Sequence, residues 1–383
     1  MTHTIDVSRG ERVGTVSNQW ASRPDDQKFL NLKDLRAQVA RWADESTSVE
    51  VLPAEIEAVY SEDDTDYLRL QIGGNAVDAT HYAYDQVARM AGAPARYLRT
   101  LPGPLAATCL NYGLQSAEQK AVAAYLRTGG GEPTIRAITS PRYGRIYDRD
   151  VVDAVIRVQE AGDWKVPGCI DWAARTGVAY NPRVDVTKDS TTLYASDRDV
   201  FLFLVDDLNP IEVGKLANGD PDLMFRGFYV WNSEVGDKTF GIATMYLRGV
   251  CQNRNLWGVE GFNEIRFAHT SGAPDRFFTE ASPALLEYAN GSTSKVVMGV
   301  AAAKNRIVAK TDEERVEFLA RFGFSEKTSR SLIGISLEEE QRPPESVWDF
   351  AQAITASARQ ETYQDQRIKL EAIAGRMLDR VAA

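Results

Sequence analysis

Apolar and β-branched residues gather in short segments through the middle of the chain. Two of these segments, 225–231 and 239–251, flank a polar run over residues 232–238, which is typical of a β-hairpin. The other strand-like segments are 134–140, 178–186, 191–195, 200–205 and 264–267. Short strands joined by hairpin-like connections favour an antiparallel sheet over repeated β-α-β units.

Helical periodicity marks much of the N-terminal part of the chain. Leu32, Leu35, Val39 and Trp42 recur at helical spacing and predict a helix over about residues 28–44. Strand-like and then helix-compatible segments follow, the former at 49–59 and 67–72, the latter at 82–91, 96–101, 105–113 and 118–127.

Helix-compatible segments also fill the C-terminal part of the chain. They span 284–290, 293–307, 312–322, 326–333, 346–357 and 362–381, and a further helix is expected earlier, at 151–158. The sequence therefore predicts an α+β fold, in which a central antiparallel sheet carries an N-terminal helical cluster and a C-terminal helical region. The expected parts are an N-terminal α/β region over 1–128, a β-rich core over 129–280 and a helical region over 281–383.

The composition is that of an ordinary globular protein, because 44% of the residues are hydrophobic and 26% are charged. No window approaches the ~18 consecutive apolar residues that a membrane span needs. The first residues also lack the apolar core of a signal peptide. We therefore expect a cytoplasmic protein without a membrane partner.

Cysteine, histidine and glycine patterns indicate no metal site and no cofactor. The three cysteines and three histidines are scattered, without zinc-ligand spacing. The glycine run 129–131 precedes Glu132 and Pro133, and it lacks the Lys-Ser/Thr pair of a phosphate-binding loop. The net charge of −10 opposes nonspecific attraction to nucleic acid, but it leaves room for a local basic groove.

Arginine and tyrosine alternate in and after the strand expected at 134–140. The residues are Arg136, Arg142, Tyr143, Arg145, Tyr147 and Arg149. Guanidinium groups bind phosphates bidentately and aromatic rings stack on bases, so this mixture suits single-stranded nucleic acid or a nucleotide. The alternative is a surface loop whose arginines pair with nearby aspartates, such as Asp148 and Asp150.

Turn chemistry can explain the polar run of the hairpin. Asn232 and Ser233 can satisfy backbone groups of a turn, and Gly236 can supply a positive φ. Glu234 could instead act as a general base or as a metal ligand, although the spacing shows no partner carboxylate.

A second basic set begins in the second segment of the hairpin and continues beyond it. Arg248, Arg254, Arg266 and His269 could form a basic binding surface for nucleic acid or phosphate. Residues of opposite parity point to opposite faces of a strand, so these side chains need not converge. A catalytic dyad of Cys251 and His269 would need spatial adjacency, and a buried inert thiol is the commoner case.

Three strings in this part of the chain resemble a phage/plasmid-like family, domain of unknown function 932, which includes prophage proteins of enterobacteria. The strings are RGFYVWNSEVGDKTFGIATMYLRGVCQNRNLWGVE, IRFAHT and ITSPRYGRIYD, and the resemblance covers roughly residues 136–269. Its most distinctive part is Asn232-Ser233-Glu234-Val235-Gly236, followed by Arg248-x-Val250-Cys251-x-Asn253. Members of the family are expected to carry glycine where this chain has Arg254. The resemblance implies DNA transactions of phages or plasmids, and it assigns no catalytic residue.

Taken together, the patterns predict a noncatalytic nucleic-acid-handling protein, and the resemblance implies that it belongs to a phage or mobile element. It would bind or anneal single-stranded DNA in recombination through an Arg/Tyr-lined groove, which assembly of a homo-oligomer into a ring or filament could lengthen. One alternative is a nucleotide-binding enzyme or sensor, in which Arg142, Arg145, Arg254 and His269 hold phosphates and Glu234 is the acid or base. The other is an interaction protein that counteracts a host defence.

Overall fold

Two β-sheets form the framework of the chain. The computed structural model describes residues 23–60, 67–129, 131–166, 186–188, 191–215, 219–248, 254–255, 264–361 and 364–382. Helices pack on both sheets, so the α+β class expected from the sequence is confirmed.

The larger sheet is built around a long hairpin. Its strands are β1 (Lys28–Phe29), β8 (Trp164–Lys165), β9 (Leu193–Ala195), β10 (Val200–Lys215), β11 (Pro221–Asn232), β12 (Phe240–Arg248), β13 (Arg254–Asn255) and β14 (Glu264–Phe267). Their order is β1-β9-β10-β11-β12-β13, while β8 also pairs with β10 and β14 with β12. All of these described pairings are antiparallel, which confirms the predicted central antiparallel sheet.

Side chains alternate between the two faces of this sheet, as strand geometry requires. In β11, Met224 and Phe228 belong to the large apolar core that the sheet shares with the helices. Phe225 and Tyr229 point to the opposite face, where they join a cluster made of strand residues from β9 to β12.

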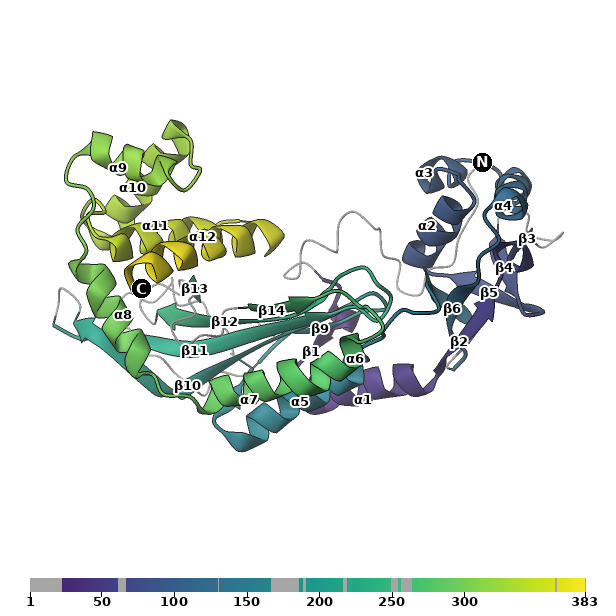
Figure 1. The fold of residues 1–383 in the computed structure, drawn as a ribbon, viewed down its shortest axis with the longest axis horizontal. Helices are drawn as coiled ribbons and strands as arrows, with labels where there is room; N and C mark the ends of the chain where they lie inside the picture. Colours follow the sequence, from purple (N-terminus) through teal and green to yellow (C-terminus); the bar gives the residue numbers. More distant parts are fainter. Residues whose placement is uncertain are drawn as a thin grey trace.

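The smaller sheet contains β2 (Ser46–Val51), β3 (Glu57–Tyr60), β4 (Leu68–Ile72), β5 (Asn75–Ala79), β6 (Val122–Arg127) and β7 (Thr134–Thr139). Its order is β2-β6-β7-β5-β4-β3, and β5 and β7 run parallel. The helices α2 (His81–Met90), α3 (Ala95–Leu98) and α4 (Gly103–Ser116) accompany this sheet at one end of the molecule (Figure 1). Most of their buried apolar residues share a core with the sheet.

The remaining helices belong to the larger sheet or to the C-terminal region. They are α1 (Leu32–Asp44), α5 (Asp148–Ala161), α6 (Ala273–Arg276), α7 (Ser282–Asn290), α8 (Ser294–Asn305), α9 (Asp312–Ala320), α10 (Glu326–Glu340), α11 (Val347–Arg359) and α12 (Gln364–Ala382). Helices α1, α5 and α7 run along one face of the larger sheet, and α9 to α12 gather at the end remote from the smaller sheet (Figure 1).

The structure differs from the expected elements at several places. The strand expected at 49–59 is divided into β2 and β3 by a 3-10 turn at Pro53–Glu55, and β5 lies where no element was expected. Part of the helix expected at 118–127 is strand β6, because it lies between β2 and β7 and its four central residues are buried. Pairing on both sides outweighs the moderate helix propensity of its alanines. Strand β7 follows residue 129, yet it joins the smaller sheet, while α1 and β1 pack with the larger one. Residues 178–185 of an expected strand lie outside the described residues.

Candidate functional site where the two sheets meet

A β-bulge turns the first arginine of the Arg/Tyr set toward the larger sheet. Tyr125 pairs with Ala137 and Leu126 pairs with Ile135, so Arg136 is an extra residue in β7. Such bulges change the direction in which a strand side chain points. The Arg136 side chain is only 1% exposed, which places its guanidinium group inside the protein.

Glu234, at the tip of the β11–β12 hairpin, meets this arginine. Its Oε2 accepts hydrogen bonds from Nη1 of Arg136 at 2.8 Å and from the hydroxyl of Tyr125 at 3.2 Å. Its Oε1 accepts one from the backbone N–H of Asp148 at 2.8 Å. The guanidinium also donates to the carbonyl of Asp197 at 3.1 Å. A buried ion pair is tolerated when extra hydrogen bonds of this kind complete it.

The polar run of the hairpin is a turn, as the sequence suggested, but its side chains also reach out of the turn. Gly236 has a φ of 86°, and the hydroxyl of Ser233 donates to the carbonyl of Arg198 at 2.6 Å. The side-chain amide of Asn232 donates to Oδ1 of Asp148 at 2.7 Å and to the carbonyl of Ile146 at 2.8 Å. The turn therefore fixes the start of α5 as well as its own backbone.

Asp148 places a second carboxyl group in this buried region, close to Glu234. Burial and the neighbouring charge of Glu234 raise the pKa of Asp148 well above its usual value. Glu234 is 2% exposed and fully engaged, which argues against the general-base role considered from the sequence.

The loop between β7 and α5 packs its rings and guanidinium groups into the same junction. Tyr143 stacks on His269, with ring centroids 5.0 Å apart, and donates to the carbonyl of Ser233 at 3.0 Å. Arg145 lies over the ring of Tyr125 at 3.7 Å from its centroid and donates to the carbonyl of Glu234. These contacts occupy Tyr143 and Arg145, so neither side chain is poised to receive a ligand.

His269 and Tyr147 also make internal contacts. The Nδ1 atom of His269 lies 3.1 Å from the carbonyl oxygen of Gly144, and burial lowers the pKa of the imidazole. A buried imidazole with a lowered pKa gains a positive charge less readily, which argues against the phosphate-binding role considered for His269. The guanidinium of Arg149 lies 5.2 Å from the ring centroid of Tyr147, which is partly buried.

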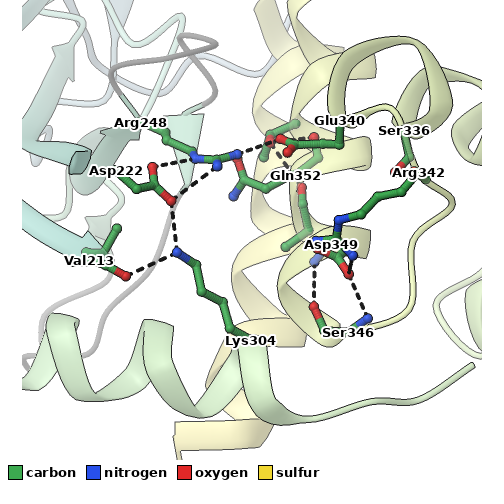
Figure 2. Close-up of polar contacts among 12 residues, drawn as sticks. Val213, Asp222, Arg248, Lys304, Ser336, Glu340, Arg342, Ser346, Asp349 and Gln352 are labelled. Carbon is green, nitrogen blue, oxygen red and sulfur yellow. Dashed lines mark hydrogen bonds and ion pairs between the residues drawn. The ribbon is translucent and has the colours of Figure 1, made fainter. Parts of the chain in front are cut away.

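Arg248 belongs to a separate ionic cluster that joins the larger sheet to the C-terminal helices (Figure 2). It donates to Asp222 through Nε at 2.8 Å and through Nη2 at 3.2 Å, and to Glu340 on α10 at 2.6 Å. Lys304 on α8 also binds Asp222, at 2.8 Å, and both cations lie over the ring of Trp348. These contacts argue against a phosphate-binding role for Arg248. The hydrogen bond and ion pair of Arg136 with Glu234 argue in the same way against such a role for Arg136.

Among the predicted phosphate ligands whose side chains the structure describes, Arg142 and Arg266 are the two that stay exposed. No carboxylate pairs with either side chain among the described residues, and Nε of Arg266 donates to the hydroxyl of Thr239 at 2.8 Å. Tyr143, which follows Arg142 in the loop, stacks on His269, and His269 lies three residues after Arg266 in the chain. Both arginines therefore lie at the same end of the larger sheet. Arg254 in β13 pairs with Leu247 in β12. The side chain of Arg254 lies outside the described residues, as does Cys251.

The residue that the sequence argument missed is Trp231. Trp231 pairs with Gly241, and Gly241 pairs with Arg266, so the three residues form one row across β11, β12 and β14. A Cβ atom on Gly241 would lie 2.0 Å from Cζ2 of Trp231, which shows that the indole lies across the glycine toward β14. The sequence signal for Trp231 is that aromatic residues, including Tyr229 and Trp231, occupy alternate positions of β11, which places them on one face of the strand.

The aromatic row continues inward from Trp231 over the same face of the sheet. Tyr229 lies 5.5 Å from Trp231, Phe201 lies 5.7 Å from Tyr229, and Tyr194 lies 6.0 Å from Phe201, measured between ring centroids. Trp231 is partly buried, whereas the other three rings are almost completely buried. Trp231 is therefore the ring of this row that a ligand could reach.

Other kinds of site receive no support from the described residues. They contain no group of three or more histidine, cysteine, aspartate or glutamate residues arranged to hold a metal ion. None of their helices is both long enough and apolar enough to span a membrane.

Comparisons with family models, with curated proteins and with solved structures each gave no match. The family resemblance and the function therefore rest on the residues themselves.

Proposed function

We propose that this chain is a nucleic-acid-handling protein that binds single-stranded DNA without catalysing a reaction. The observation that carries the proposal is the row of Trp231, Gly241 and Arg266, in which the partly buried indole lies over Gly241 and the next strand carries an exposed arginine that has no carboxylate partner among the described residues. A base can stack on an aromatic ring while an arginine binds the adjoining phosphate. This pairing of groups suits an unpaired strand, whose bases are free to stack.

Arg142 extends the same surface. It is exposed, and the neighbouring Tyr143 holds its loop against His269, close to the end of β14. Two cations at one end of the sheet give a local positive region in a chain of net charge −10. The resemblance of residues 136–269 to a phage and plasmid family points to the same class of activity.

The nucleotide-binding enzyme has less support. That alternative needs Glu234 as an accessible acid or base, but Glu234 is 2% exposed and paired with Arg136. It also needs His269 as a phosphate ligand, and the imidazole has a lowered pKa and a backbone partner.

Binding of a fluorescently labelled single-stranded oligonucleotide, measured by anisotropy over a range of salt concentrations, tests the proposal. We expect affinity to fall as salt rises, and the slope of log K against log salt to decrease by roughly 0.7 for each phosphate contact removed in Arg142→Ala and Arg266→Ala. The matched control is Arg330→Ala, because Arg330 is an exposed arginine on α10 paired with Glu326. Absence of binding at low salt, or equal effects of all three substitutions, would refute the proposal.

A further inference from the structure

The smaller sheet has two edges, and α4 covers one of them. β3 forms this edge, where Oδ1 of Asn111 accepts from the backbone N–H of Ala58 at 2.7 Å. The Nδ2 group of the same side chain donates to the carbonyl of Ala58 at 3.0 Å. The carboxamide thus occupies the donor and acceptor that another strand would use, and natural proteins protect sheet edges by such means.

β2 forms the opposite edge, and no described residue covers it as Asn111 covers β3. Its residues Ser46–Val51 pair with β6 on the inner side. In the described parts of the chain, no hydrogen bond is made to the outward backbone groups of this strand. Thr47, Ser48 and Glu50 are exposed, and the strand contains neither proline nor lysine, the residues that commonly prevent edge pairing.

We propose that β2 is a self-association edge, which pairs antiparallel with β2 of a second copy of this chain around a two-fold axis. Two antiparallel β2 strands would bond through the backbone groups that point away from β6, and these groups belong to every second residue. The numbers of two opposed residues are therefore both even or both odd, and a pair with good overlap is centred on Ser48 or Val49. Glu50 then faces Ser46 or Ser48 of the second copy and never another Glu50. Parallel pairing in register would instead place the two glutamates side by side.

The covered edge determines how far assembly proceeds. A filament of sheets needs two open edges in each copy, whereas Asn111 closes the edge at β3. A two-fold contact through β2 uses the same surface on both copies and leaves no further site. The assembly is therefore a closed dimer, in place of the ring or filament considered from the sequence. This inference goes beyond nucleic-acid binding and does not depend on it.

Sedimentation velocity of the full chain without nucleic acid measures the assembly state directly. We expect a concentration-dependent dimer with twice the chain mass of 42.4 kDa and no larger species. A pair of six-residue strands is small for an interface, so the dimer should dissociate on dilution. A purely monomeric chain up to about 1 mM, the weak end of specific association, or growth beyond the dimer would overturn the inference.

A substitution with a matched control locates the interface. In Ser48→Glu, the new carboxylate faces the same substituted residue of the second copy when the pair is centred on residue 48, and Glu50 of the second copy when it is centred on Val49. Like charges oppose each other in both registers, so we expect at least a tenfold weaker dimer. Tyr60→Glu adds the same charge at an exposed position on the covered edge and should leave the dimer unchanged. Equal effects of the two substitutions, or none from Ser48→Glu, would overturn the assignment.

Hydrogen exchange of the unmodified chain gives a second readout that needs no variant. Exchange at the outward amides of residues 46–51 should slow as the protein concentration rises, because pairing protects them. Unchanged exchange across the monomer–dimer transition would place the interface elsewhere and overturn the inference.

Discussion

Arg136 is the residue on which the contact between the two sheets depends most. It lies in a bulge of the smaller sheet, and its charge is balanced by Glu234 from the hairpin of the larger sheet. Both side chains are almost completely buried, at 1% and 2% exposed. A charge left unpaired in such a place is costly, because water cannot solvate it.

We predict that Arg136→Met lowers the free energy of unfolding by about 3–5 kcal/mol, the usual cost of removing one partner of a buried ion pair. Urea unfolding followed by circular dichroism measures this loss. The control Arg330→Ala removes an exposed ion pair and should change stability by less than about 1 kcal/mol. Similar small losses in both variants would show that the Arg136–Glu234 pair does not stabilise the fold.

Single residues also show how far the sequence could go. Asn232, Ser233 and Gly236 were predicted to build a turn from their local chemistry, and they do. The partners of Glu234 were beyond prediction, because Arg136 is 98 positions away and reaches it only through a bulge that depends on strand register. Of the nine residues proposed to bind phosphate, Arg142 and Arg266 are the two whose described side chains remain exposed.

At the scale of elements, local periodicity predicted most helices but could not identify β6. The helix expected at 28–44 is α1, and the helix expected at 312–322 is α9, where the side chain of Thr311 accepts a hydrogen bond from the backbone N–H of Glu314. Segment 118–127 has alanines that fit a helix or a buried strand equally well, so its partners β2 and β7 decide its state. Such pairing between distant segments leaves no local signal.

The beginning of α5 should make stability depend on pH. Asp148 has a raised pKa in the folded chain because of burial and the charge of Glu234. The folded chain therefore retains a proton that the unfolded chain loses near pH ~4. The stabilisation associated with neutral Asp148 is fully present below that unfolded pKa, and it is lost as pH rises through the folded pKa.

Asp148→Asn removes this titration while keeping an oxygen that can accept from the amide of Asn232. We expect the variant to become more stable relative to the natural chain as pH rises above ~4, with each unit of pKa shift contributing about 1.4 kcal/mol. Thermal or urea unfolding of both proteins at several pH values gives the difference. A difference that stays constant with pH would mean that Asp148 titrates alike in the folded and unfolded chains.

At the scale of the whole molecule, the fold class followed from the sequence, whereas the membership of single strands in the two sheets did not. β7 lies between β6 and β5 in the smaller sheet although it follows residue 129, and β1, near the N-terminus, pairs with β9 in the larger sheet. Most side chains of the Arg/Tyr loop, including Tyr143 and Arg145, make contacts inside the junction between the two sheets. The surface left for a ligand is therefore smaller than the groove inferred from composition, and it centres on Trp231 and Arg266.

The most direct test of this account compares two oligonucleotides of equal length and charge, one with thymine bases and one abasic. Stacking on an aromatic ring contributes about 1–3 kcal/mol per base, so the thymine strand should bind the natural chain roughly tenfold or more tightly. Trp231→Leu should remove most of that preference while leaving the salt dependence that Arg266 provides. Equal affinity for the two strands, or a preference that survives Trp231→Leu, would contradict the account.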